Sequence, residues 1–143
     1  MSLDKLTIHP DECLKICKQY YDEKTYEHAL RVAEYVRTMG AIPREYHVDC
    51  MMLALMHDLL EDTDYTGEDL PPKFREALEL LTKEEGLSYA SYCHSLRPTQ
   101  TSDPVYVCAW FVKLADMKDH LTLTDTLTDR LKEKYLKGLA QLL

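Results

Sequence analysis

Apolar side chains recur at three- and four-residue spacing along most of the chain, which is the pattern of helices that bury one face. No segment between turn signals alternates apolar and polar residues as a half-buried strand does. The sequence therefore predicts an all-α fold. With 143 residues, the chain can bury a core as a single domain, a helical bundle over residues 1–143, without disulfide or metal staples.

Start and stop signals divide this pattern into separate helices. Proline suits the first helical position, and Gly40 is expected to take the left-handed conformation that ends the second helix. Connections are expected at residues 63–72 and 97–104, which are rich in Gly, Pro, Asp, Ser and Thr. The predicted helices run from Pro10 to about Tyr21, from about Thr25 to Thr38, from Pro43 through VDCMMLALMHDLLED to Asp62, from Pro72 to about Leu81, from Ser88 to about Leu96, from Pro104 to about His120, and from Asp125 to Leu142.

A histidine interrupts the apolar face of the second predicted helix. His28 lies in line with Val32, Tyr35, Val36 and Met39, at helical spacing on one face. A histidine on such a face is more often a hydrogen-bonded core residue than a metal ligand. Taken alone, His28 therefore defines no site.

The third predicted helix ends in the acidic segment MHDLLEDTD, residues 56–64. His57, Asp58, Glu61 and Asp62 directly follow an apolar run. The C-terminal end of a helix carries a partial negative charge, which disfavours bare carboxylates. A positive group is therefore expected beside this segment.

Another carboxylate, Asp116, ends the apolar stretch VYVCAWFVKLAD on a face that is expected to be buried. An unpaired buried carboxylate is strongly destabilising, so Asp58 and Asp116 require a cation or hydrogen bonds. The residues leave two explanations open. One is a shared divalent metal, and the other is a set of ordinary salt bridges with Arg31, Lys113 or Lys118.

His28, His57, Asp58 and Asp116 offer a mixed nitrogen and oxygen donor set from three helices. This set suits Mn²⁺ or Fe²⁺, whereas Mg²⁺ is less suited to imidazole. Because the set contains no cysteine, a structural zinc site fits it poorly. We expect a divalent metal cofactor, with Mn²⁺ in first place and Fe²⁺ or Mg²⁺ as alternatives.

The order H…HD…D resembles the signature of the HD superfamily of metal-dependent phosphohydrolases. The segments HDLLEDT (57–63), LTKEEGLSYASY (81–92) and VKLADMKDHL (112–121) also resemble, in order, parts of the hydrolase domain of stringent-response (p)ppGpp hydrolases. The resemblance covers about residues 25–121. It implies an HD-type helical bundle that hydrolyses a nucleotide or a related small phosphoester, with guanosine 3',5'-bis(diphosphate) as a specific candidate.

The resemblance also implies roles for individual residues. His28, His57, Asp58 and Asp116 would hold the metal, as the donor chemistry also suggests. Glu61 and Asp62 match the acidic pair that handles the attacking water in guanosine polyphosphate hydrolases. Glu61 lies one helical turn after His57 and Asp58, so it could orient or deprotonate water, and Asp62 could pass a proton to the leaving group. A solvated acidic helix end is the alternative for this pair.

Two basic residues are candidates for contact with substrate phosphates. Lys113 matches the lysine of the family's KLAD segment and could hold Asp116 or a phosphate, or could be a surface lysine. Arg31 lies one turn after His28 and could clamp a phosphate. Surface pairing with Glu27 or Glu34 explains Arg31 equally well.

Tyr89 and Tyr92 could form a wall for a base or sugar, although packing alone explains tyrosines at such positions more often. His120 stands where the (p)ppGpp hydrolases often have Asn, near the substrate ribose and phosphate. It could act there as a donor or an acid. The lead-in YYDEKTYEHALRVA also lacks the basic, glycine-containing sequence that usually precedes the first histidine of those hydrolases.

Composition narrows the expected partners and compartment. The net charge of −8 argues against a nucleic-acid partner, and the apolar stretches are too short for a membrane span. The five cysteines form no CxxC pair, which together with the absence of a signal-peptide pattern indicates the cytoplasm. A small phosphorylated ligand is compatible with this charge, because a few local cations suffice to bind it. The family resemblance implies that this ligand is a nucleotide.

Two non-enzymatic hypotheses compete with the phosphohydrolase. The first is a sensor module that binds metal and nucleotide without turnover, although such a module has no need of Glu61 and Asp62. The second is an interaction domain that presents its acidic surface to a basic partner. It predicts that no metal is bound and that a chelator leaves stability unchanged.

Overall fold

A computed structural model describes residues 8–97, 103–123 and 125–143. All the regular structure in these ranges is helical, which confirms the predicted all-α fold. None of these helices combines the length and apolar character that crossing a bilayer requires. The elements are α1 (Pro10–Tyr20), α2 (Glu23–Arg37), the 3₁₀ helix η2 (Arg44–Tyr46), α3 (His47–Met56), α4 (Leu59–Asp62), α5 (Pro72–Leu80), α6 (Tyr89–Ser95), α7 (Pro104–Thr122) and α8 (Asp129–Leu142).

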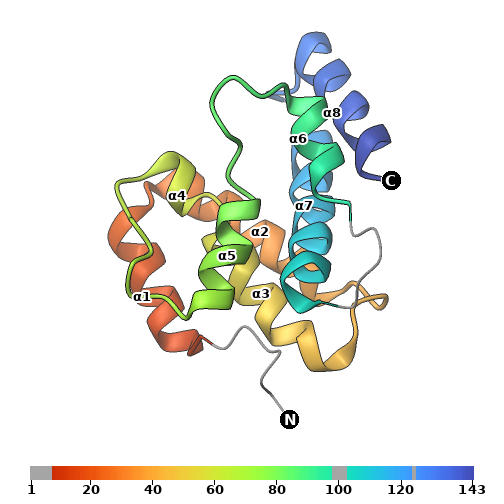
Figure 1. Cartoon of the computed structure of the whole chain (residues 1–143). Coiled ribbons are helices and arrows are strands. Elements are labelled where there is room, and N and C mark those ends of the chain that lie inside the picture. The colour runs from red at the N-terminus through yellow and green to blue at the C-terminus, as the bar shows by residue number, and fades with distance from the viewer. Residues whose placement is uncertain (1–7, 98–102, 124) are drawn as a thin grey trace.

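Helix α7 forms the centre of the fold, because it packs against α2, α3, α5 and α8. In Figure 1, α6 and α8 lie together on one side of the molecule, and α1 and α4 lie on the other. Buried residues occur on several faces of α7, among them Val105, Cys108 and Val112, and they include the charged Asp116 and Asp119. Charged side chains of α7 are therefore buried in the core, where this helix packs against α2 and α3.

The third predicted helix is not continuous. The structure divides it into η2, α3 and α4, with the break at His57 and Asp58. The hydroxyl of Tyr21 donates a hydrogen bond to the carbonyl oxygen of Leu55 (2.8 Å) and accepts one from the backbone N–H of Asp58 (3.2 Å). This side chain supplies hydrogen-bond partners to the backbone at the helix end, which stabilises the break.

Two helix starts differ from the sequence prediction because an earlier or later residue supplies the cap. Helix α2 begins before Thr25, since the carboxylate of Asp22 accepts a hydrogen bond from the N–H of Thr25 (2.7 Å). Helix α8 begins after Asp125, with Thr128 accepting from the N–H of Leu131 (3.1 Å). The other predicted boundaries agree with the structure within about two residues.

The expected left-handed conformation at Gly40 was wrong. Of the glycines in the described residues, only Gly67 and Gly86 have a positive φ. Helix α2 ends at Arg37, and the N–H of the capping residue Thr38 donates to the carbonyl oxygens of Tyr35 and Val36. A right-handed final turn satisfies these carbonyls and leaves Gly40 without a special role.

Helix α8 packs closely on α6 because residue 138 is a glycine. A Cβ atom at Gly138 would lie 2.6 Å from Cε2 of Tyr89 and 3.0 Å from Sγ of Cys93. Any side chain at this position would therefore push the two helices apart. The close approach carries Lys134 and Tyr135 of α8 to the cavity that also contains the predicted site residues.

The helix break provides a test of this local structure. Tyr21→Phe is expected to lower the free energy of unfolding by about 1–3 kcal/mol, because the polar backbone groups of Leu55 and Asp58 lose a buried partner. Chemical denaturation followed by circular dichroism measures the change. Tyr20→Phe, which removes the hydroxyl of a more exposed neighbouring ring, is the matched control and should change stability little. Equal effects of the two substitutions would contradict the role of Tyr21.

Candidate metal centre

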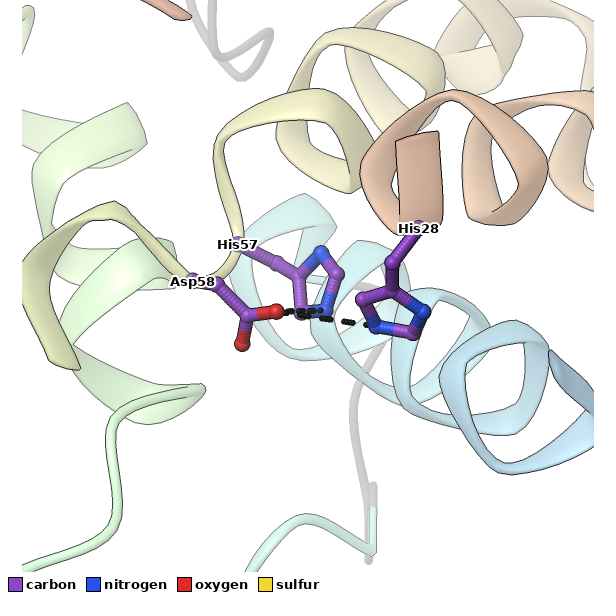
Figure 2. A group of neighbouring side chains, drawn as sticks. All are labelled: His28, His57 and Asp58. Carbon is purple, nitrogen blue, oxygen red and sulfur yellow. Dashed lines mark ion pairs between the residues drawn. The ribbon is translucent and has the colours of Figure 1, made fainter. Parts of the chain in front are cut away.

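Two of the predicted ligands lie at the helix break and a third faces them from α2. Figure 2 shows His57 and Asp58 at the end of α3 and His28 on α2, with their side chains pointing toward one another. Oδ2 of Asp58 lies 3.2 Å from Nε2 of His57 and 3.5 Å from Nε2 of His28. Because α3 ends at Met56, these two successive residues lie outside the helix and can face one point.

Asp116 of α7 completes the predicted set. Its Oδ1 lies 2.9 Å from Nε2 of His28 and 3.3 Å from Nε2 of His57. Its Oδ2 accepts a hydrogen bond from Nζ of Lys113 (2.8 Å), so the two carboxylate oxygens have different partners. The structure thus brings together His28, His57, Asp58 and Asp116, the four residues expected to bind a metal.

Hydrogen bonds of the other ring nitrogens orient both imidazoles. Nδ1 of His57 lies 2.6 Å from the carbonyl oxygen of Ala54, which can only accept a hydrogen bond. Nδ1 of His28 lies 2.6 Å from Oδ2 of Asp119. With Nδ1 protonated in each ring, the neutral form carries its lone pair on Nε2, the atom that faces the carboxylates. This is the arrangement of metal-binding histidines, whose second nitrogen is held by a carboxylate or carbonyl.

Asp119 also belongs to this cluster, although its sequence position did not single it out. It is fully buried and also accepts hydrogen bonds from Nε (2.8 Å) and Nη2 (3.1 Å) of Arg31. Burial disfavours its ionised form, but Arg31 and His28 outweigh this effect and lower the pKa of Asp119. The residue spacing could have indicated this position. Asp119 follows Asp116 by three residues, as Arg31 follows His28, so each pair shares a helix face.

Arg31 has a partner, Asp119, that was not among those expected from the sequence. Its guanidinium binds Asp119 behind His28, while the carboxylate of Glu34 is held by Arg37 at 2.9 Å. Lys118 places its Nζ 4.6 Å from the centre of the Tyr35 ring. Of the salt bridges considered for Asp116, the structure contains the one with Lys113.

The charges in this cluster depend on one another. Burial favours the neutral form of Asp116, yet Lys113 and the surrounding histidines hold its pKa well below the usual range. Burial likewise opposes protonation of His57, but Asp58 and Asp116 raise its pKa well above the usual value. The ionised carboxylates therefore need positive charge, from protonated imidazoles or from a cation that replaces their protons.

The residues present fit a divalent metal ion. Ligand atoms on adjacent corners of an octahedron lie about 3 Å apart when each is about 2.1 Å from the ion. The separations between imidazole nitrogens and carboxylate oxygens given above are 2.9–3.5 Å. A metal could thus be accommodated by small shifts of side chains that already converge.

A cavity of about 230 Å³ opens beside these residues. The acidic pair Glu61 and Asp62 lies on its wall, and so do Tyr89 and His120. Residues with cationic or aromatic side chains make up much of the remaining wall: Lys83, Lys113, Lys134, Tyr92 and Tyr135. The cavity therefore places carboxylates close to cationic groups, an environment suited to a phosphorylated ligand.

The acidic pair lies at the edge of the cavity. Oε2 of Glu61 accepts a hydrogen bond from the N–H of Lys83 (3.0 Å), which ties α4 to the connection after α5. Partial burial and the nearby charges of Asp58 and Glu61 raise the pKa of Asp62. Lys83 lies in residues 81–92, one of the segments that carry the family resemblance, but its local sequence did not predict that it lines the cavity.

Lys113 is buried, so the alternative of a surface lysine was wrong. Its Nζ lies 5.0 Å from the ring centre of Tyr89 and 4.9 Å from that of Tyr92. Burial opposes the charge of Lys113, but Asp116 and the two tyrosines raise its pKa well above the usual value. The two rings line the cavity and also pack, with the hydroxyl of Tyr92 donating to the carbonyl oxygen of Leu81.

A comparison with models of protein families gives a match. The family model described as HD domain matches residues 25–121, which is more than half of the chain. The chain belongs to the HD-domain family, whose members are generally metal-dependent hydrolases. No curated protein matches the chain.

Loss of the carboxylate behind His28 should weaken metal binding. Asp119→Ala is expected to raise the Kd for Mn²⁺ about 10- to 100-fold, the usual effect of removing a group that orients a ligating histidine. Isothermal titration calorimetry measures the Kd, and thermal melting without metal confirms that the variant is folded. Glu34→Gln, which removes an exposed ion pair on α2, is the control and should bind Mn²⁺ as the wild type does.

Metal binding should also depend on pH. Asp58 and Asp116 raise the pKa of His57 well above its usual value, so its ring keeps a proton on Nε2 to higher pH than a free imidazole and must lose that proton to bind a cation. The Kd for Mn²⁺ should therefore rise as the pH falls through and below this raised pKa. Calorimetry from about pH 6 to about pH 8 in buffers of different ionisation enthalpy measures the Kd and the protons released. A Kd that is independent of pH would argue against His57 as a ligand.

Proposed function

We propose that this HD-domain chain is a metal-dependent phosphohydrolase that acts on a small phosphorylated substrate, with a nucleotide as the substrate class. One observation carries the proposal. Glu61 and Asp62 share a cavity with the candidate metal ligands and with the lysines Lys83, Lys113 and Lys134. A sensor that only binds its ligand needs the cation and the lysines, but it does not need two additional carboxylates beside them.

In the proposed hydrolysis, Glu61 and Asp62 each transfer a proton. A divalent cation bound at His28, His57, Asp58 and Asp116 would lower the pKa of water and neutralise charge on the phosphoryl group. Glu61 takes a proton from the attacking water, whose oxygen forms a bond to phosphorus. The bond from phosphorus to the leaving oxygen breaks, and Asp62 gives that oxygen a proton. The raised pKa of Asp62 suits a carboxyl group that must be protonated for part of the cycle.

The remaining residues are assigned to the substrate. Lys83 and Lys134 bind phosphate oxygens, while Tyr89 lies against a base or sugar, an assignment supported by their place on the cavity wall. Lys113 supports the site by holding Asp116. Arg31 acts through Asp119 rather than on the phosphate, since two of its nitrogens bind that carboxylate.

The specific form of the proposal is a guanosine 3',5'-bis(diphosphate) 3'-pyrophosphohydrolase that uses Mn²⁺. The motif resemblance of residues 57–63, 81–92 and 112–121 supports it, and the mixed nitrogen and oxygen ligand set supports Mn²⁺ or Fe²⁺ over Mg²⁺. The five free, buried cysteines are in keeping with the cytoplasm as the proposed location.

A substrate panel tests the proposal. The protein is incubated with Mn²⁺ and separately with ppGpp, GTP, deoxynucleoside triphosphates, nucleoside monophosphates and cyclic dinucleotides, and products are resolved by ion-exchange chromatography. Conversion of ppGpp to GDP and pyrophosphate is the result expected of the specific form. Cleavage of another compound keeps the phosphohydrolase and changes its substrate. Bound metal without turnover of any compound would favour the sensor.

The acidic pair generates a further prediction. Asp62→Asn should lower kcat at least about 100-fold, because general acid–base catalysis typically contributes that much, while the Kd for Mn²⁺ stays within about twofold. Steady-state kinetics and calorimetry on the same preparation give both values. Asp64→Asn changes an exposed acid two residues further along and should leave both unchanged. Wild-type turnover in Asp62→Asn would refute the role assigned to Asp62.

A further inference from the structure

A third imidazole lies against the same oxygen of Asp116 as the two histidines of the predicted set. Nε2 of His120 is 3.2 Å from Oδ1 of Asp116, compared with 2.9 Å for His28 and 3.3 Å for His57. Asp116 and His120 are four residues apart on α7 and therefore share one face. Ligands with this spacing on a helix can bind one ion together.

Hydrogen bonding to Asp116 alone does not explain this convergence. A carboxylate oxygen has two lone pairs and can accept about two hydrogen bonds, yet Oδ1 has three ring nitrogens within 3.3 Å. The other oxygen of Asp116 is already bound to Lys113. A cation that all four atoms share removes the difficulty, because each nitrogen then directs its lone pair to the ion instead of competing for the oxygen.

The ring of His120 is held in this orientation by two neighbouring rings. It stacks on Tyr135 of α8, with ring centres 4.6 Å apart and an interplanar angle of 9°. The ring also lies against His28, at 4.9 Å between ring centres. The contact with Tyr135 depends on the close packing of α8, so the position of Nε2 is fixed by the fold and not by Asp116 alone.

We propose that His120 is a fifth protein ligand of the metal, in addition to His28, His57, Asp58 and Asp116. This inference rests on the metal site of the proposed function. It replaces the contact with substrate that the family resemblance implied for this position. A third imidazole makes the site richer in nitrogen and therefore shifts its preference from Mg²⁺ toward Mn²⁺, Fe²⁺ and Co²⁺.

Metal titration of His120→Asn tests the proposal without reference to activity. The Kd for Mn²⁺ is expected to rise about tenfold or more, since loss of a ligand should cost at least as much as loss of a group that orients one. The Kd for Mg²⁺ should change less, so the difference in affinity between the two ions becomes smaller. His94→Asn, which replaces an exposed histidine on α6, is the matched control and should bind both ions as the wild type does.

A measurement on the wild type avoids any effect of the substitution on folding. Pulsed electron paramagnetic resonance of the Mn²⁺-loaded protein, with and without ¹⁵N-labelled histidine, counts the ligating imidazole nitrogens. Three nitrogens support the proposal, whereas two nitrogens, or a His120→Asn variant that binds Mn²⁺ as tightly as the wild type, overturn it. If the wild type binds no Mn²⁺ while remaining folded, the metal site of the proposed function fails with it. Where the wild type binds Mn²⁺, Asp58→Ala tests the site independently of His120. It should abolish binding whichever role His120 has.

Discussion

The ionised carboxylate of Asp116 in the middle of α7 is the constraint on which the structure of this site depends. Transferring such a charge from water to the interior is costly unless cations or hydrogen bonds surround it. Lys113 binds one oxygen, and histidines from α2, the end of α3 and α7 itself face the other. The helices that form the core thereby acquire a fixed relation to one another, because each must place a positive or potentially positive group at the same point.

Groups further from Asp116 hold these partners in place. Asp119 binds both His28 and Arg31, and the carbonyl of Ala54 fixes the ring of His57. Tyr21 stabilises the helix break that lets His57 and Asp58 face one point. Each of these groups is a hydrogen-bond partner of a candidate ligand or of its backbone, so these side chains are already positioned and a cation would meet little opposing rearrangement.

Helical phase and motif spacing were sufficient to predict part of this arrangement. The apolar stripe that contains His28 and the stretch before Asp116 predicted that both residues face inward, and in the structure they lie within 3.5 Å of one another or of His57 and Asp58. Local sequence could not reveal the break after Met56, because the break depends on the hydroxyl of Tyr21, the residue that follows α1. It also could not place Lys83, Lys134 or Tyr135, since their positions follow from the packing of α8 and of the connection before α6. Residues that act through tertiary packing leave no periodic signal in the chain.

The helix break also relieves part of the electrostatic problem posed by the segment MHDLLEDTD. In one continuous helix, Glu61 and Asp62 would lie at the negative C-terminal end, next to each other and to Asp58. With α3 ending at Met56, the group at its C-terminus is His57, and the partial negative charge of that end favours a protonated imidazole or a bound cation. Glu61 and Asp62 belong to the separate short helix α4, where Glu61 is bound by a backbone N–H of Lys83. The same break therefore places positive charge where the helix favours it and moves the acidic pair away from the end of the long helix to the wall of the cavity.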